Sequence, residues 1–269
     1  MTNNRPNRPT THLEVLSKEW LTPDMLRLIV GGSNFPAFRD NGLPEAYVKI
    51  VFDPDGNPYS SPVDVTKMRE EEPREKWPKT RTYTVRWVDH DRQRLALDFV
   101  IHGDEGVAAP WAVNCSIGDM IQFMGPGGKW SPDETSDFHL FVGDESSLPA
   151  ISASLERLPE DARGVVVVEV SEHVVNVQHP AGITLDWIVR GGNDYDPEAL
   201  AKRVRSLDLK DKGNISVFAH GERDAMKQLR RVFTELEIPR ERLSISGYWA
   251  YGRVEDVFQA EKRAEMGKI

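Results

Sequence analysis

The first half of the chain alternates apolar and polar positions with a period of two. Between residues 95 and 101, Leu95, Leu97 and Phe99 would share one face of a strand, and the residues between them would share the other. Short strands divided by Pro, Gly and Asp turns are typical of an antiparallel barrel or sandwich. The charged stretch from Asp64 to Lys79 is expected to be a mobile loop between two strands. Further strands are expected at 26–30, 47–52, 83–87 and 120–124.

After Pro132 the pattern changes to strands that alternate with helices. Residues 165–170 form a valine-rich run, which is typical of a strand buried on both faces of a parallel sheet. Asp196-Pro197-Glu198 offers the cap, proline and acidic first turn that open a helix. This alternation predicts a doubly wound α/β domain. Strands are expected at 139–142, 165–170, 184–189, 215–219 and 243–247, and helices are expected from 148, from 196, around 226–236 and at 254–268.

Composition narrows the class of protein. The 269 residues suffice for two domains, and 29% charged with 39% hydrophobic residues is a globular balance. A net charge of −9 disfavours binding to nucleic acid and to membrane surfaces. The single cysteine, Cys115, excludes an intramolecular disulfide and a cluster held by several thiolates. No apolar run reaches the ~18–20 residues of a membrane helix, and the polar start is no signal peptide, so we expect a cytoplasmic protein.

The usual hydrolytic and metal motifs are absent from the sequence. There is no HExxH, no phosphate-loop lysine and no GxSxG, and the seven histidines are scattered. The glycine-rich GPGGK at 125–129 has no phosphate-loop spacing, so we interpret it as a tight turn. We therefore expect chemistry that a bound cofactor supplies.

Two segments of the first half have the residue types of a cofactor site. Arg81 and Tyr83 stand two positions apart and would share a strand face, where the arginine could pair with a phosphate while the tyrosine packs on an aromatic ring system. The small residues of 106–109 would let backbone amides approach a pyrophosphate. The structural alternatives are an ordinary strand and a plain loop before a short helix.

Two segments of the second half lie at expected strand ends. Residues 143–150, GDESSLPA, join the first strand of the α/β domain to its helix, where such sheets bind nucleotides. Tyr248 and Trp249 end the last strand and could stack on a planar cofactor. The alternatives are a helix cap and core packing.

Taken in order, these segments resemble the siderophore-interacting protein family of ferredoxin-reductase-like flavoproteins. The resemblance extends from about Leu13 to the end of the tail helix. It rests on RTYTVR, DFVIHG with its following WA, GDMIQFMGPGG, GDESSLPAI and the closing SGYW with a glycine after it. It implies a six-stranded Greek-key FAD-binding barrel, a doubly wound NAD(P)-binding domain and a C-terminal helix. The expected boundaries are an arm at 1–12, the barrel at 13–131, the α/β domain at 132–252 and the helix at 253–269.

The resemblance also implies roles for particular residues. Residues 81–84 would hold the flavin, ribityl and phosphate region with Val100 and His102 alongside, and the 106–109 loop would serve the pyrophosphate. Ala109 and Pro110 stand where the family often has a serine, and Ala250 follows Trp249 where a basic residue is common. The implied cofactor residues are Arg81, Thr82, Tyr83, Thr84, Val100, His102, Gly106, Ala108, Ala109, Asp144, Glu145, Ser146, Tyr248 and Trp249, and the candidates for an anionic ferric chelate are Arg253, Lys262 and Arg263.

The implied activity is reduction of a ferric siderophore by NADH or NADPH through FAD in a monomeric protein, with ferredoxin as another possible donor. Glu169 and Glu172, near the end of a strand, favour NADH slightly, because an acidic residue there can accept from ribose hydroxyls. Two alternatives stay open. One is a general flavin reductase or electron-transfer flavoprotein without siderophore specificity, and the other is a non-catalytic siderophore-binding protein.

Overall fold

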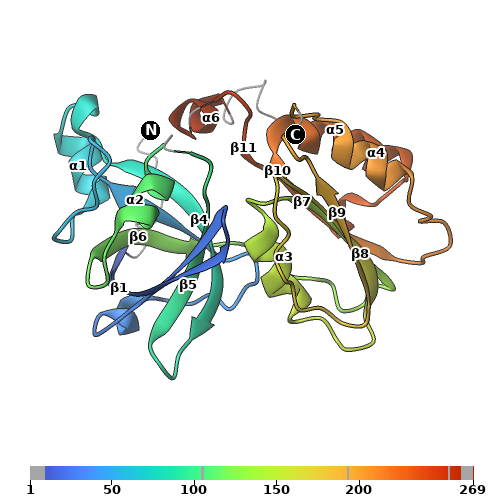
Figure 1. Cartoon of the computed structure of the whole chain (residues 1–269), viewed down its shortest axis with the longest axis horizontal. Coiled ribbons are helices and arrows are strands. Elements are labelled where there is room, and N and C mark those ends of the chain that lie inside the picture. The colour runs from blue at the N-terminus through green and yellow to red at the C-terminus, as the bar shows by residue number, and fades with distance from the viewer. Residues whose placement is uncertain (1–9, 104–105, 193, 254, 262–268) are drawn as a thin grey trace. The chain divides into compact units, whose positions relative to one another are not determined.

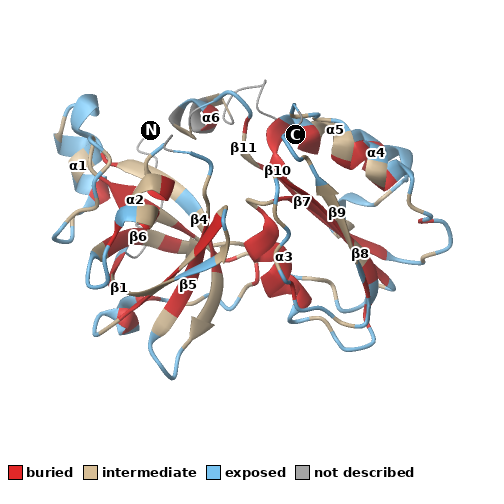
Figure 2. Cartoon of the chain, in the orientation of Figure 1, coloured by how far each residue is buried: buried red, intermediate tan, exposed pale blue. Residues whose placement is uncertain are grey.

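The computed structural model describes residues 10–103, 106–192, 194–253, 255–261 and 269. These residues divide into two compact units, Met1–Lys129 and Trp130–Ile269. Each unit has its own apolar core (Figure 2). None of the described helices combines the length and apolar character that a membrane crossing requires.

The first unit is a closed antiparallel barrel, as predicted (Figure 1). The strand order is β1-β2-β5-β4-β3-β6, and pairing of β1 with β6 closes the barrel. The period-two pattern explains the interior, because alternate apolar side chains fill it while their neighbours face outward. The strands are β1 (Thr10–Thr22), β2 (Met25–Gly31), β3 (Tyr47–Phe52), β4 (Lys79–Asp89), β5 (Arg94–Val100) and β6 (Met120–Gly127), with helix α2 (Ala108–Asn114) and a 3-10 turn, η1 (Phe35–Ala37).

Two parts of this unit differ from the sequence-based expectation. The stretch expected to be a loop contains helix α1 (Val65–Glu71) and the 3-10 turn η2 (Arg74–Lys76). The Asp64 carboxylate accepts hydrogen bonds from the Thr66 and Lys67 amides, and this capping lets a charged segment start a helix. Strand β1 begins at Thr10, so the last three residues of the expected arm belong to the barrel, and residues 1–9 lie outside the described residues.

The glycine-rich stretch at 125–129 continues β6 along the start of β3. Gly128 has a φ of +126°, and a Cβ there would lie 2.8 Å from the Glu45 carbonyl oxygen. A Cβ on Gly127 would lie 2.5 Å from the Tyr47 ring. Close packing against the Glu45 backbone and the Tyr47 ring therefore explains these two glycines without a phosphate.

The second unit is a parallel five-stranded sheet of order β11-β10-β7-β8-β9, the doubly wound arrangement that was predicted. Figure 1 shows α4 and α5 on one face of this sheet and α3 on the other. The valine run forms β8, which pairs on both sides. The elements are β7 (Phe138–Asp144), α3 (Leu148–Leu155), β8 (Arg163–Val170), β9 (Gly182–Val189), α4 (Ala199–Arg205), β10 (Ile215–Glu222), α5 (Arg223–Glu235), the 3-10 turn η3 (Arg240–Arg242), β11 (Leu243–Trp249) and α6 (Glu255–Glu261).

Two helix boundaries in this unit differ from the prediction. Helix α4 begins at Ala199, because Asp196 and the two residues after it form a turn in which the Ala199 amide donates to the Asp196 carbonyl. Helix α6 is described as far as Glu261, and residues 262–268 lie outside the described residues.

Strand β7 has β10 on one side and β8 on the other, so the order of strands in the sheet reverses its direction between β7 and β10. In doubly wound sheets, ligands bind at the carboxyl ends of the strands at this reversal.

Candidate functional site

The first group of predicted residues meets at one end of the barrel, which we call the α2 end. Here β3 ends, β4 begins, and Trp111 of α2 packs on Phe52 with ring centroids 5.9 Å apart. Arg81 pairs with Ile50 and Tyr83 pairs with Val48, which are both fully buried. Directly opposed residues share a face, so Arg81 and Tyr83 lie on the inward face. Their spacing predicted that they share a face, and the structure shows which face it is.

Aromatic packing holds the Tyr83 ring in place. Its centroid lies 4.3 Å from that of Phe99 on β5, and Phe99 in turn lies 6.4 Å from Trp111. Tyr83 is half-buried, so Phe99 and the barrel core do not cover its side chain completely. Thr82 and Thr84 pair with Lys49 and Tyr47 and therefore lie on the opposite face, where Thr82 is exposed and Thr84 is buried.

The predicted pyrophosphate segment also lies at the α2 end. Ala108 and Ala109 belong to the first turn of α2 and not to a loop, and both are buried. Val107 precedes them and makes no side-chain hydrogen bond to the first-turn amides. Gly106 has a φ of +88° and open space where a Cβ would be. Val100 ends β5 half-buried, and His102 is exposed two residues later.

These residues fit FAD. Arg81 supplies a cation, Tyr83 supplies a half-buried aromatic ring, and the Val107 side chain does not cap the Ala108 and Ala109 amides at the start of α2. A cation and two backbone amides suit a pyrophosphate, although Pro110 offers no third amide, and an aromatic ring suits a flavin. Tertiary packing thus brings segments from residues 81–84, 100–102 and 106–109 to one end of the barrel.

The second group lies at the carboxyl edge of the parallel sheet, around Asp144. The Asp144 Oδ1 accepts hydrogen bonds from the Ser146 amide (2.9 Å) and the Ser146 hydroxyl (2.5 Å). Its Oδ2 accepts from the Glu222 amide (2.7 Å) and the Trp249 indole Nε1 (2.8 Å). Burial raises the pKa of the Asp144 carboxyl, and the hydrogen bonds from Ser146, Trp249 and the Glu222 amide counter that rise. Asp144 therefore joins the ends of β7, β10 and β11.

Gly221 allows this arrangement. Its φ is +154°, and a Cβ there would lie 2.5 Å from the Asp144 Oδ2. Glycine is therefore required where β10 passes the Asp144 carboxylate. Tyr248 leaves the same edge in another direction and packs edge-on against His220, with ring centroids 5.0 Å apart. Within this unit the two rings therefore have different neighbours, His220 for Tyr248 and Tyr195 for Trp249.

Three residues of this edge were not predicted from the sequence, namely Arg190, Tyr195 and Glu222. The Glu222 carboxylate caps α5, because its Oε2 accepts from the Asp224 amide (2.6 Å) and the Ala225 amide (2.9 Å). The Tyr195 hydroxyl donates to the same oxygen at 2.5 Å. One signal could have found Glu222, because Gly221-Glu222 repeats the glycine-acid pair Gly143-Asp144 at the end of a predicted strand.

Of four further predicted residues, two lie among the described residues, namely Glu145 and Arg253. The Glu145 carboxylate accepts hydrogen bonds from the amide and the hydroxyl of Ser171 after β8. Arg253 is 45% exposed in its side chain and pairs with Glu261 at 3.1 Å, so part of its charge is neutralised. Lys262 and Arg263 lie outside the described residues. Among the residues that the structure describes, no group of three or more His, Cys, Asp or Glu side chains is arranged to hold a metal ion.

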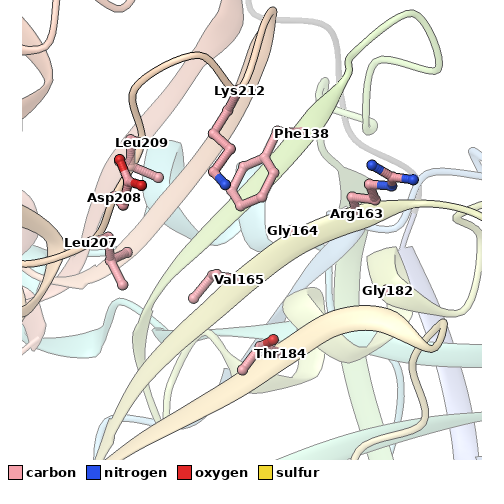
Figure 3. A pocket seen from close by; sticks show the side chains of 10 residues that line it. All are labelled: Phe138, Arg163, Gly164, Val165, Gly182, Thr184, Leu207, Asp208, Leu209 and Lys212. Carbon is pink, nitrogen blue, oxygen red and sulfur yellow. The ribbon is translucent and has the colours of Figure 1, made fainter.

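A separate cavity of about 370 Å³ lies at the opposite edge of the sheet, where β7, β8 and β9 begin (Figure 3). The Lys212 Nζ lies 5.7 Å from the centroid of the Phe138 ring in this cavity. None of the predicted site residues lines it. It is therefore not part of the edge formed around Asp144.

The environment of Glu169 predicts that the stability of the protein depends on pH. It is buried at the end of β8, and burial together with the nearby carboxylates raises its pKa from 4.5 to about 7, although Arg190 opposes the rise. The folded protein therefore keeps a proton that the unfolded chain loses, and the stability contributed by Glu169 is lost as the pH rises from about 4.5 through about 7. We expect Glu169→Gln to match the wild type at pH 5 and to be more stable by about 1–3 kcal/mol at pH 8.

Thermal and denaturant unfolding at the two pH values measures this difference. Glu172→Gln is the matched control, because Glu172 is exposed three residues further along. It should leave stability unchanged at both pH values. Equal stability of Glu169→Gln and the wild type at pH 8 would show that Glu169 is already ionised there at no cost.

The barrel with an arginine–tyrosine end and the doubly wound sheet with a ligand edge define a two-unit, nucleotide-binding flavoprotein. Family models agree with this class. The model described as "Siderophore-interacting FAD-binding domain" matches residues 14–130, and the model described as "Siderophore-interacting protein" matches residues 136–252. The chain belongs to the siderophore-interacting protein family.

Relatives and solved structures support this membership. The chain is 30% identical to ferric vibriobactin reductase ViuB of Vibrio cholerae, over 94% of both chains. It is 28% identical to the NADPH-dependent ferric-chelate reductase of Escherichia coli, over 92% of this chain and 98% of the relative. The crystal structure of the siderophore-interacting protein SipS from Aeromonas hydrophila matches with a TM-score of 0.80 and 27% identity, over 98% and 100%.

A more distant structure places the fold in a wider group. Ferredoxin-NADP+ reductase from Plasmodium falciparum matches with a TM-score of 0.64 over 89% of this chain and 96% of that chain. At 13% identity, this likeness concerns the fold alone. The ferredoxin-reductase-like architecture expected from the sequence is thereby confirmed.

Proposed function

We propose that this protein is a ferric-siderophore reductase that takes electrons from NAD(P)H and delivers them to Fe(III) in a siderophore. The observation that carries the proposal is the meeting of Arg81, Tyr83 and the start of α2 at one barrel end, in a chain that also contains a nucleotide-type sheet edge. The names of the Vibrio cholerae and Escherichia coli relatives support the acceptor.

In this reaction, the residues of the chain would bind and orient FAD and the coenzyme. When bound, FAD accepts a hydride and can return its two electrons singly, which suits a one-electron acceptor such as Fe(III). Arg81 would hold the pyrophosphate and Tyr83 would pack on the flavin ring, while the strand ends at Asp144 and Glu222 receive the coenzyme. Each NAD(P)H converts two Fe(III) to two Fe(II) and releases one proton. Because Fe(II) binds hard oxygen chelators less tightly, the reduction frees the iron.

The proposal also covers the preferred coenzyme, the residue that contacts the ferric chelate, and the oligomeric state and location of the protein. We propose NADH as the preferred donor because Glu169 at the end of β8 can accept from ribose hydroxyls, although the Escherichia coli relative is named for NADPH. Arg253 is the described candidate for contact with an anionic chelate. We also propose that the protein works as a monomer in the cytoplasm.

An assay with the flavin-loaded protein tests the function. NADH or NADPH is mixed with a ferric siderophore under nitrogen, and Fe(II) is trapped with a coloured chelator. We expect coenzyme-dependent Fe(II) formation in a ratio of about two per coenzyme. Equal rates with every simple acceptor would favour the general flavin reductase. Siderophore binding in the absence of FAD would favour the non-catalytic siderophore-binding protein.

A further inference from the structure

Tyr195 closes the sheet edge at the point where its direction of growth reverses. Its hydroxyl donates to the Glu222 Oε2 at 2.5 Å, and its ring stacks on Tyr251 with centroids 5.0 Å apart and lies 6.2 Å from the Trp249 ring. Burial and the Glu222 carboxylate raise the pKa of Tyr195, so its hydroxyl stays protonated and donates. With Tyr195 in this position the pocket holds about 20 Å³, which is room for about one water molecule.

The charged residues around this pocket determine which kind of ligand group could take the place of the Tyr195 hydroxyl. Four acidic residues, Asp144, Glu145, Glu169 and Glu222, line the pocket together with Arg190, and the Arg190 guanidinium pairs with Glu169 at 3.4 Å, so the lining is acidic overall. The amides at the start of α5 already bind Glu222, so a phosphate would meet carboxylates there and no open amides. A neutral hydrogen-bond donor, such as a ribose hydroxyl or a carboxamide N–H, matches these acceptors.

We infer that Glu222 accepts a hydrogen bond from the coenzyme, and that the Tyr195 hydroxyl occupies this acceptor until the coenzyme displaces it. The inference rests on the proposed function, because it assumes a pyridine dinucleotide at this edge. It makes Glu222 a coenzyme-binding residue and Tyr195 a latch over the site.

Described residues on both sides of Tyr195 are anchored by hydrogen bonds, and two glycines lie where the first anchor ends. The amides of Arg190 and Gly191 donate to the carbonyls of Val170 and Ser171, which anchors one end beside β8. The other end is anchored by Asp196, which accepts from the Glu198 amide at 2.9 Å. Gly191 and Gly192 have φ angles of +60° and +80° with open space at their Cβ positions, so the backbone can turn there when Tyr195 leaves.

Removing one hydroxyl tests the latch. Tyr195→Phe keeps the ring but removes one of the three donors to the Glu222 Oε2, which still accepts from the Asp224 and Ala225 amides. A hydrogen bond to a charged acceptor is worth about a 10- to 100-fold change in an equilibrium. If the site is closed in most molecules, the apparent affinity falls in proportion to the fraction of molecules in which the site is open. We therefore expect Tyr195→Phe to bind NAD+ and NADP+ about tenfold more tightly than the wild type. Titration calorimetry on the oxidised, flavin-loaded protein measures the Kd. A gain in affinity is not what simple structural damage produces.

Two further variants make the result specific. Tyr251→Phe removes a hydroxyl from the neighbouring stacked ring, which is 62% exposed, and should leave the Kd unchanged. Glu222→Gln should weaken coenzyme binding, and combining it with Tyr195→Phe should abolish the tenfold gain. Thermal unfolding of each variant shows that the protein is still folded. Nicotinamide mononucleotide and 2′,5′-ADP, used as half-ligands, identify which half of the coenzyme benefits.

The outcomes separate the latch from the function. If the wild type is reduced by NAD(P)H but Tyr195→Phe binds neither coenzyme nor half-ligand more tightly, the latch is overturned and the reductase stands. If neither coenzyme reduces the flavin in any variant, the proposed function is overturned and the latch with it. If only Tyr195→Phe binds the coenzyme measurably, the latch is supported in its strongest form.

Discussion

Replacing Arg81 with alanine is expected to weaken FAD binding about 10- to 100-fold, because it removes the charge-assisted, bidentate contact that we propose Arg81 makes with the pyrophosphate. The double variant Arg81→Ala/Tyr83→Ala should lose the yellow colour altogether, since it removes both the cation and the aromatic face at the α2 end. Absorption spectra of the purified proteins measure the bound flavin, and titration of the flavin-free proteins with FAD measures the Kd.

Controls separate lost contacts from lost folding. Arg92→Ala removes an arginine from the turn after β4, where the side chain is 74% exposed and pairs only loosely with Asp89 at 4.0 Å. It should bind FAD as the wild type does. Tyr83→Phe keeps the ring that packs on Phe99 and should retain the colour. A colourless Arg92→Ala, or a yellow double variant, would contradict an Arg81–Tyr83 flavin site.

Asp144→Ala is expected to destabilise the second unit by about 3–5 kcal/mol. Its carboxylate receives four hydrogen bonds from Ser146, Glu222 and Trp249, and the alanine leaves the Glu222 amide and the Trp249 indole without that acceptor. Each buried donor left unsatisfied costs about 1–3 kcal/mol. For a unit of this size, the transition should fall by roughly 6–15 °C.

Circular dichroism and flavin absorbance, followed separately during heating, measure this loss in the two units. Ser146→Ala is the graded control, because it removes only the hydroxyl donor and keeps the amide that also binds Asp144. It should cost about 1 kcal/mol. A transition of Asp144→Ala within 2 °C of the wild type would mean that the joined strand ends contribute little to stability.

Much of the fold follows from periodicity. The alternation of Leu95, Leu97 and Phe99 predicted a strand whose side chains are fully buried in the barrel, and the valine run predicted a strand inside a parallel sheet. Both patterns reflect burial directly, so they predict a strand without knowledge of which elements pack against it. Predictions failed where a local hydrogen bond decided the structure, as when Asp64 capped α1 within the charged stretch.

The flavin site was predictable in part. The spacing of Arg81 and Tyr83 placed both on one strand face, because a strand has a period of two. That the same face meets Phe99 and Trp111 depends on the strand order and on how α2 covers the barrel end. The family resemblance, and not the spacing, grouped Thr82 and Thr84 with the arginine, and the structure puts both threonines on the other face.

By itself, the sequence determined the two periodicities, the strand-then-helix order of the second half, and the paired arginine and tyrosine. Tertiary structure alone decided that Asp144 meets the Glu222 amide and the Trp249 indole, which are 78 and 105 residues away along the chain, and that Tyr195 caps the same edge. The physical reason is that short-range pattern encodes which face of an element is buried and where it ends. Which strand ends become neighbours is set by the order of strands in the sheet, and that order emerges only when all the apolar faces are buried together.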